Sequence, residues 1–306
     1  MSLHHRKDHT HGHQSANRQA LFIAFLMIFG FMIVEAIGGL LTNSLALLSD
    51  AGHMLSDAAA LFLSLLAMWF ATKPPSAEKT YGYHRFEILA AFINGVTLAL
   101  ISFYILWEAY KRLQDPPTVA SIGMITIAAI GLVVNMIAAY VLMKGDTSHN
   151  LNMRSAFLHV IGDLIGSIGA VAAGILMLWF EWYWADPIIS AVIAILILVS
   201  AWRVTRDSVH VLMEGTPKHI SLQNLRESLS QLAGVKDVHD LHVWTVTSGF
   251  TALSCHLVID ETMNSQHLLQ SARRLLQKEF GIEHSTLQLE KGQLCGQEDI
   301  CEEDYV

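Results

Sequence analysis

The sequence predicts an α-helical membrane protein with six transmembrane helices, followed by a cytoplasmic α+β domain whose elements run in the order αββαβ. The chain of 306 residues is 53% hydrophobic and only 15% charged, which is too apolar for an ordinary soluble domain. Residues from about 19 to 211 form six apolar runs, and beyond about residue 216 the composition becomes that of a small soluble domain. The chain therefore divides into a membrane part and a soluble part.

Residues 1–17 form a polar, His-rich segment before the first apolar run. This composition cannot supply a hydrophobic core, so we expect a disordered tail on the cytoplasmic side. The segment does not resemble a secretory signal peptide, and the first membrane helix is expected to direct insertion. A His-rich tract is typical of loose metal capture, although a solvated tail with no role in transport explains the composition equally well.

The six apolar runs each reach the ~20 residues that a helix needs to cross a bilayer. Short turns or segments with proline and glycine separate them, and the Trp and Tyr at 182–184 are typical of a membrane interface. We place the transmembrane domain at 18–213, the cytoplasmic domain at 214–292 and an acidic, Cys-containing tail at 293–306. The runs cover residues 19–41, 44–71, 85–112, 119–143, 151–179 and 184–211.

The distribution of positive charge predicts the orientation. Most Lys and Arg residues lie at the N-terminus and in segments that six spans would place on the same side, whereas Lys111 and Arg112 lie on the other side. Because cytoplasmic segments carry the excess of Lys and Arg, both termini are expected in the cytoplasm. The three cysteines, Cys255, Cys295 and Cys301, form no paired framework and are expected as reduced thiols. No basic tract suggests nucleic-acid binding.

The soluble part combines helical and strand patterns. Two segments have helical periodicity, three others alternate apolar and polar residues, and Ser248-Gly249 marks a turn between two strands. The order αββαβ predicts a ferredoxin-like sandwich of two helices on a three-stranded sheet. The expected helices are Leu222–Leu232 and Ser265–Glu279, and the expected strands are Val235–Val246, Phe250–Ile259 and Ser285–Leu289.

Two apolar runs each carry a His and an Asp four residues apart, namely His53 with Asp57 and His159 with Asp163. At this spacing both side chains of a pair lie on one helical face. Ionisable residues at bilayer depth are costly and mark function by default. Two His and two Asp supply the four nitrogen and oxygen ligands of a tetrahedral Zn²⁺, and two carboxylates balance its charge. We interpret these residues as the intramembrane site of a metal transporter.

A structural interpretation remains for each pair, in which the His and the Asp form a hydrogen bond that stabilises helix packing. Two copies with the same spacing, order and apolar setting favour metal binding. Asp50 lies on the same stripe as His53 and either guides ions along an exit path or caps locally. Glu35 and Asn135 on other runs either line a water-filled path or bridge helices. Bound His must be neutral and bound Asp ionised, so metal loading falls with acidity and metal–proton exchange is expected.

The soluble part carries a second set of candidate ligands. His239 and His256 lie on two expected strands, Glu290 follows the last strand, and Cys295 and Cys301 lie in the tail. Gathered on one small fold, these residues are suited to bind further metal ions. Surface histidines without a ligand role are the alternative. The spacing of the two tail cysteines is looser than that of a CxxC pair.

These motifs resemble those of the cation diffusion facilitators, specifically the zinc-transporting branch that includes bacterial zinc and cobalt–zinc–cadmium efflux proteins. The resemblance covers essentially the whole chain. It rests on SLALLSDAGHMLSD at 44–57, YGYHRFE at 81–87, RSAFLHVIGD at 154–163 and HDLHVW at 239–244. It implies a homodimer with six spans per subunit in the bacterial plasma (inner) membrane, a metallochaperone-like cytoplasmic domain that dimerises, and proton-coupled export by alternating access.

The resemblance also implies roles for individual residues. His239, His256 and Glu290 match cytoplasmic metal-site positions, although Gln288 and Glu290 stand where some members have His and Asp. The two tail cysteines loosely resemble the Cys pair of vertebrate relatives. A basic–acidic interlock near the membrane–cytosol boundary corresponds to Arg85 and Glu214. The transport site of the family corresponds to His53, Asp57, His159 and Asp163.

The sequence thus predicts a secondary active transporter, not an enzyme, that exports Zn²⁺ from the cytoplasm in exchange for protons. Cd²⁺ and Co²⁺ stay open as substrates because metal affinity alone does not decide selectivity. Zn²⁺ is expected as substrate and as regulator, and no other cofactor is expected. The expected partners are protons, membrane lipid and a second copy of the chain. A membrane zinc hydrolase is disfavoured because a catalytic zinc keeps one ligand position open. A sensor or channel would use the same site without coupled flux.

Overall fold

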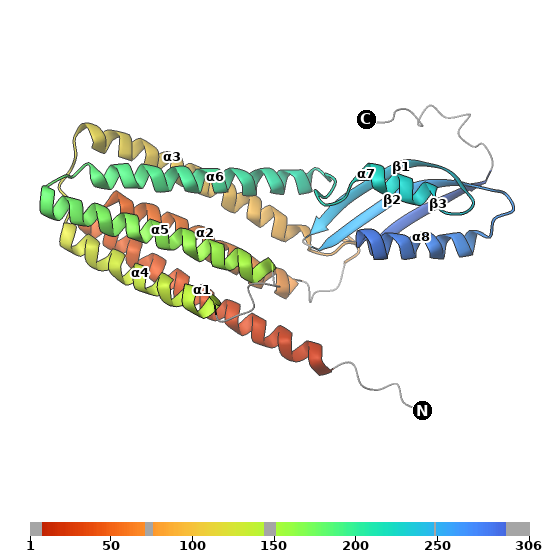
Figure 1. The fold of residues 1–306 in the computed structure, drawn as a ribbon, viewed down its shortest axis with the longest axis horizontal. Helices are drawn as coiled ribbons and strands as arrows, with labels where there is room; N and C mark the ends of the chain where they lie inside the picture. Colours follow the sequence, from red (N-terminus) through yellow and green to blue (C-terminus); the bar gives the residue numbers. More distant parts are fainter. Residues whose placement is uncertain (1–7, 71–75, 144–150, 248, 292–306) are drawn as a thin grey trace. The chain divides into compact units, whose positions relative to one another are not determined.

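A computed structural model describes residues 8–70, 76–143, 151–247 and 249–291 of the chain (Figure 1). For part of these ranges, including residues 8–21 and 151–163, it describes the backbone alone. The chain divides into two compact units. One unit comprises residues 1–69 and 90–205, and the other comprises residues 70–89 and 206–306.

Six long helices follow the six apolar runs, which confirms the predicted helical membrane fold (Figure 1). By length and hydropathy, three of the described segments can cross a bilayer, namely Phe25–Thr42, Arg85–Gln114 and Ala185–Leu212, and Ser121–Ile137 and Gly166–Phe180 are shorter apolar helices. The six helices are α1 (Asp8–Thr42), α2 (Leu45–Phe70), α3 (Arg85–Gln114), α4 (Ser121–Met143), α5 (Leu151–Phe180) and α6 (Ala185–Leu212).

Helix α1 begins well before the first apolar run. The structure has helical backbone from Asp8, so the expectation of a disordered segment at 1–17 is wrong for residues 8–17, and residues 1–7 lie outside the described part. The physical reason is that extending an existing helix costs far less than nucleating one. No proline interrupts the segment, so the polar residues continue the apolar helix.

Helix α2 packs between two groups of helices in the first unit. Ala46 and Leu47 join a buried cluster with residues of α4 and α5, and Leu45 joins another with residues of α3 and α6. Glycines let the neighbouring helices approach closely: Gly131 of α4 faces Phe31 of α1, and Gly169 of α5 faces Ile189 of α6. The helix that carries three candidate site residues is therefore held on several sides.

The N-terminus of α2 is capped by a side chain from α6. Asp186 is fully buried, and its carboxylate accepts hydrogen bonds from the Ser44 hydroxyl (2.6 Å), the Leu45 amide (2.8 Å) and the Ala46 amide (3.1 Å). The Ser44 hydroxyl in turn accepts from the Leu47 amide at 3.3 Å. The first amides of a helix have no partner within the helix, and the helix dipole favours a negative charge beside them. The cap therefore fixes α2 to α6.

Arg112 completes this corner of the first unit. Its Nη1 lies 3.9 Å from Asp186 Oδ2 and donates a 2.7 Å hydrogen bond to the carbonyl of Asn43, while its Nε donates to Glu108 at 3.1 Å. Asn43 has a φ of 58°, a conformation that Asn tolerates well and that makes the sharp turn between α1 and α2. Helices α1, α2, α3 and α6 thus meet in one polar network.

The second unit contains the predicted αββαβ domain. Strands β1 and β2 pair antiparallel, and β3 lies parallel to β2. Ser221 and Asn264 cap the N-termini of the two helices, and Gly281, with a φ of 66°, ends the second. The elements are α7 (Leu222–Ser230), β1 (Val235–Thr247), β2 (Phe250–Ile259), α8 (Ser265–Phe280) and β3 (His284–Lys291), which agree closely with the expected segments.

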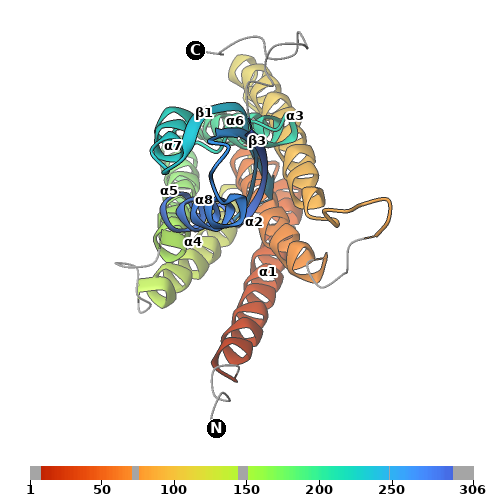
Figure 2. The ribbon, with the colours of Figure 1, turned by 90° about the vertical axis from the view of Figure 1, so that its right-hand side faces the viewer.

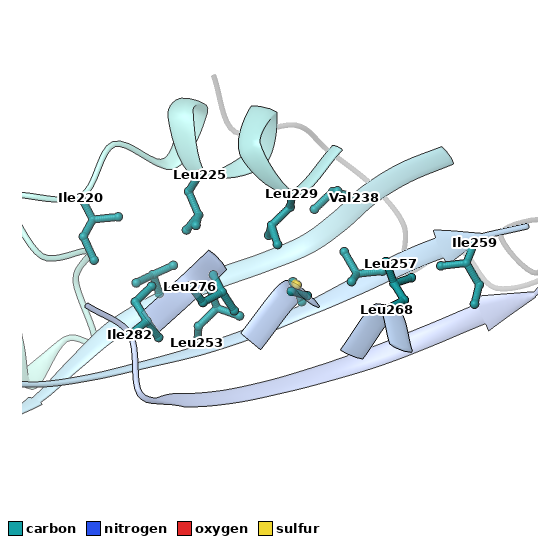
Figure 3. Packing of buried hydrophobic residues seen from close by; sticks show 13 residues of the cluster. Ile220, Leu225, Leu229, Val238, Leu253, Leu257, Ile259, Leu268, Leu276 and Ile282 are labelled. Atoms are coloured by element: carbon teal, nitrogen blue, oxygen red, sulfur yellow. The ribbon is translucent and has the colours of Figure 1, made fainter. Parts of the chain in front are cut away.

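One face of the sheet packs against α7 and α8 (Figure 2). Figure 3 shows leucines of both helices converging on Leu253 and Leu257 of β2. Side chains alternate between the two faces of a strand, so His256, between buried Cys255 and Leu257, points to the face opposite the helices. The same alternation places Glu290, next to Leu289, on that face of β3.

We expect Asp186→Ala to lower the free energy of unfolding by about 3 kcal/mol, because it leaves a buried hydroxyl and two buried amides without their acceptor. Thermal unfolding of the purified protein in detergent measures the loss. Asp207→Ala is the matched control: Asp207 also lies on α6, but its 2.6 Å ion pair with Lys218 is exposed and is worth about 0–1 kcal/mol. Equal shifts for the two variants would contradict the cap.

Candidate metal-binding sites

Helix α2 presents three of the predicted site residues. Asp50 and Asp57 are 4% and 7% exposed, and His53 between them is partly buried. A Cβ added to Gly166 of α5 would lie 3.4 Å from Asp50 Oδ1, so α5 passes directly beside this carboxylate. A buried carboxylate in an apolar helix bundle carries a large desolvation cost, which a bound cation offsets.

The other half of the predicted intramembrane site lies on α5. His159 and Asp163 belong to this helix, but their side chains lie outside the described residues. Gly166 is three residues after Asp163 and shares its helical face. The face of α5 that carries Asp163 therefore approaches α2 at Asp50. The full set of four ligands stays a prediction.

Further polar groups bridge the helices of the first unit. Glu35 of α1 is 1% exposed, and a Cβ added to Gly131 of α4 would lie 3.0 Å from its Oε1. Asn135, one turn further along α4, donates a 3.2 Å hydrogen bond to Ser167 of α5. This contact favours the interpretation in which Asn135 bridges two helices over the one in which it lines a water-filled path.

A compact cluster of ligand atoms lies on the sheet of the second unit, with one residue from each strand. His239 of β1, His256 of β2 and Glu290 of β3 offer ligand atoms that all lie within 4.8 Å of one another. His239 Nε2 is 3.1 Å from Glu290 Oε2, and His256 Nδ1 is 3.0 Å from Glu290 Oε1. The two imidazole rings are 5.1 Å apart and nearly perpendicular. The structure thus brings together the three cytoplasmic residues that the sequence singled out.

This donor set fits a transition-metal ion such as Zn²⁺, which takes imidazole nitrogen and carboxylate oxygen in four-coordinate sites. The three protein ligands leave one position for water or another group. The tail thiols Cys295 and Cys301 lie outside the described residues. Burial raises the pKa of the Cys255 thiol to about 12, so this neighbour of His256 stays protonated and serves the core rather than the site.

The carboxylate of Glu290 is held in its ionised form. Burial alone would raise its pKa, but hydrogen bonds with Gln288 (2.9 Å) and His239, together with the charges of His239 and His256, lower the pKa below the usual 4.5. Glu290 is therefore an anionic ligand throughout the neutral and mildly acidic range. The stabilisation that ionised Glu290 provides is lost only as the pH falls below the usual pKa of Glu and through its own lower pKa. Gln288 orients this ligand through its 2.9 Å hydrogen bond.

The predicted interlock pair also meets within the second unit. Arg85 Nη2 donates a 2.8 Å hydrogen bond to Glu214 Oε1, and both side chains are well exposed. Two residues further along α3, Glu87 accepts a 2.6 Å hydrogen bond from the Thr247 hydroxyl at the end of β1. The exposed Arg85–Glu214 ion pair is worth about 0–1 kcal/mol. The hydrogen bond between Glu87 and the buried Thr247 therefore contributes more to fixing the start of α3 to the sheet.

Comparison with known proteins places both units in known families. Residues 21–213 match the cation efflux transmembrane domain, and residues 217–292 match the cytoplasmic domain of cation efflux proteins. The chain is 51% identical over 286 residues to the cadmium, cobalt and zinc/H(+)-K(+) antiporter of Bacillus subtilis, covering 92% of this chain and 91% of that protein.

Other relatives carry similar names. The zinc transporter ZitB of Pectobacterium atrosepticum is 43% identical (92% of this chain, 88% of the relative), and the metal cation efflux system protein CzcD of Cupriavidus metallidurans is 40% identical (92% and 89%). The solved metal-bound C-terminal domain of that CzcD transporter is 35% identical and covers 23% of this chain and 99% of its own, with a TM-score of 0.23. These homologues are metal cation transporters, not enzymes.

We expect His256→Ala to abolish zinc binding at the sheet cluster, because it removes the ligand that lies between the other two strands. Isothermal titration of the full-length protein measures the loss as one fewer zinc ion bound per chain. The matched control is His219→Ala, since His219 is an exposed histidine outside the cluster. Unchanged stoichiometry in His256→Ala would show that the cluster holds no ion.

Proposed function

The chain belongs to the cation efflux family of bacterial membrane transporters for zinc, cadmium and cobalt, and on this premise we propose that it exports Zn²⁺ from the cytoplasm in exchange for protons. The observation that carries the proposal is the pair of buried carboxylates on α2, Asp50 and Asp57, of which Asp50 lies beside Gly166 of α5. Cation transport explains why costly acidic groups occupy an apolar bundle.

In the proposed site, His53 and Asp57 of α2 and His159 and Asp163 of α5 surround the ion. Each pair lies four residues apart on its own helix, so each helix contributes one imidazole and one carboxylate. The two carboxylates cancel the charge of a divalent ion, which lowers the cost of holding it away from water. Asp50 lies one turn from His53 on the same stripe and would receive the ion on one side of the site.

Proton exchange is proposed on two grounds. The name of the Bacillus subtilis relative describes that protein as an antiporter with H⁺ and K⁺. The ligand chemistry also supports exchange, because imidazole and carboxylate must lose their protons to bind a metal ion and regain them when it leaves. Binding at one membrane face and release at the more acidic face then carries protons in the opposite direction. Alternating exposure of the site completes the cycle.

We further propose a homodimer in the bacterial plasma membrane, with both termini in the cytoplasm. The match to the family's cytoplasmic domain supports dimerisation, and the excess of Lys and Arg on one side supports the orientation. Light scattering of the purified protein tests the dimer, and labelling of single cysteines at the two ends in intact cells tests the orientation. A monomer, or labelling from outside, would overturn the respective proposal.

We expect Asp163→Ala to abolish zinc uptake into proteoliposomes that are acidic inside, because the outward proton gradient drives zinc inward through the proposed site. The wild-type protein should accumulate Zn²⁺, and Asp115→Asn, in an exposed loop, should behave like wild type. Uptake that survives Asp163→Ala would mean that the paired residues are structural and that the metal path lies elsewhere. Uptake that ignores the gradient would disprove the exchange with protons.

Replacement of His53 by Asp tests the selectivity of the site. We expect His53→Asp to raise Cd²⁺ uptake relative to Zn²⁺ uptake several-fold, because an oxygen ligand replaces nitrogen and the site becomes suited to larger or harder ions. Initial rates for the two ions in the same proteoliposomes give the ratio. An unchanged ratio would argue that His53 does not contact the ion.

The sheet cluster is proposed to make Zn²⁺ a regulator as well as a substrate. Zinc held by His239, His256 and Glu290 would favour one arrangement of the cytoplasmic domains in the dimer. The double variant His239→Ala, His256→Ala should therefore change the zinc concentration at which transport reaches half its maximal rate. The regulatory role fails if that concentration and the cooperativity stay those of the wild type.

A further inference from the structure

We propose that Asp240 is a positioning residue for the cytoplasmic metal site, which fixes His256 through the ring nitrogen that does not face the metal. The inference rests on the proposed metal binding by His239, His256 and Glu290. It concerns a residue with no ligand atom in that cluster. Three independent features of the structure support it: the contacts of His256, the backbone of β1, and the partner that holds Asp240.

His256 has an acidic neighbour at each of its ring nitrogens. Its Nδ1 lies 3.0 Å from Glu290 Oε1, inside the cluster, and its Nε2 lies 3.4 Å from Asp240 Oδ2, on the other side of the ring. A neutral imidazole carries a proton on one nitrogen and a lone pair on the other. When a metal ion takes the lone pair of Nδ1, the proton lies on Nε2, the nitrogen that is 3.4 Å from the Asp240 carboxylate.

The backbone of β1 is deformed where Asp240 lies. His239 pairs with His256, but His242 pairs with Ser254, so β1 has one more residue than β2 between these two pairs. Asp240 has a φ of 50°, in the left-handed region, which costs free energy for a residue other than glycine. Bulges of this kind redirect a side chain next to functional sites. Here the extra residue keeps Val238 and Val243 in the core and turns Asp240 toward His256.

A second histidine holds the other oxygen of the same carboxylate. His242 Nε2 lies 2.8 Å from Asp240 Oδ1. Asp240 and His242 are both about half exposed or more, so this contact adds orientation rather than much stability. The bulge thus supplies a fixed acceptor to His256 and leaves Glu290 and His239 facing the ion.

A carboxylate that accepts the second N–H of a metal-bound imidazole fixes the tautomer and ring orientation and makes the ligand more basic. Loss of such a partner typically weakens metal binding by about 10–100-fold. The arrangement of Glu290, His256 and Asp240 matches this pattern, with the metal-facing side at Nδ1. The residue immediately before Asp240 is itself a proposed ligand, so the same bulge also sets the direction of His239.

The test measures Zn²⁺ affinity by titration against a chelating indicator, using the full-length chain with Asp57→Asn and Asp163→Asn to weaken the proposed membrane site. Asp240→Gly removes the carboxylate and is compatible with the positive φ, so the backbone is kept. Asp240→Asn keeps an acceptor without the charge. His219→Ala is the matched control, because His219 is an exposed histidine outside the cluster. His256→Ala defines the signal that belongs to the cluster.

We expect Asp240→Gly to weaken binding by about 10–100-fold, Asp240→Asn to weaken it by less, and His219→Ala to leave it unchanged. In the zinc-bound protein, the ¹⁵N resonance of His256 Nε2–H should shift in Asp240→Gly, because this N–H loses its carboxylate neighbour. Unchanged affinity in Asp240→Gly would overturn the inference. If His256→Ala binds as much zinc as the wild type, the proposed cytoplasmic site itself fails, so the two failures are distinguishable.

Discussion

The cap that Asp186 provides to the N-terminus of α2 is the interaction on which the rest of the membrane unit depends. A bilayer offers no water to the first amides of a helix, so partners must come from the protein. Ser44 and Asp186 together satisfy the amides of Leu45, Ala46 and Leu47. Because these partners come from the turn and from α6, the start of α2 cannot shift along its axis without breaking several buried hydrogen bonds at once.

This constraint has a graded effect along α2. At 1.5 Å per residue, Asp50 lies about 9 Å from Ser44 along the helix, and Asp57 lies about 20 Å from it. A tilt of α2 about its capped end would move Asp50 little and Asp57 more than twice as far. The contact between Asp50 and Gly166 of α5 lies in the less mobile part. A helix fixed at one end is thus suited to open and close the site that we propose around Asp57.

The sequence predicted much of this arrangement and missed features that depend on tertiary pairing. Apolar runs predicted the helices, and alternation of apolar and polar residues predicted the strands. These patterns work because the buried side of each helix or strand is visible in the spacing of its own apolar residues. The spacing of His53 and Asp57 is likewise local. Asp186 gave no such signal, since in the sequence it reads as an ordinary residue at the start of α6 and its partners lie 140 to 142 residues away. The turn of Asp240 toward His256 depends on a one-residue shift in strand register, which composition does not reveal.

The two proposed metal sites differ in how their ligands are joined, and this difference suits them to different tasks. In the membrane site each helix holds one His–Asp pair at a fixed spacing, so a tilt between α2 and α5 separates the pairs without deforming either helix. In the cytoplasmic site the ligands come singly from β1, β2 and β3, and backbone hydrogen bonds fix the strands in register. Separating those ligands requires breaking the sheet. The proposed helical site is therefore suited to open and release its ion within a cycle, whereas the ligands of the proposed sheet site keep their spacing.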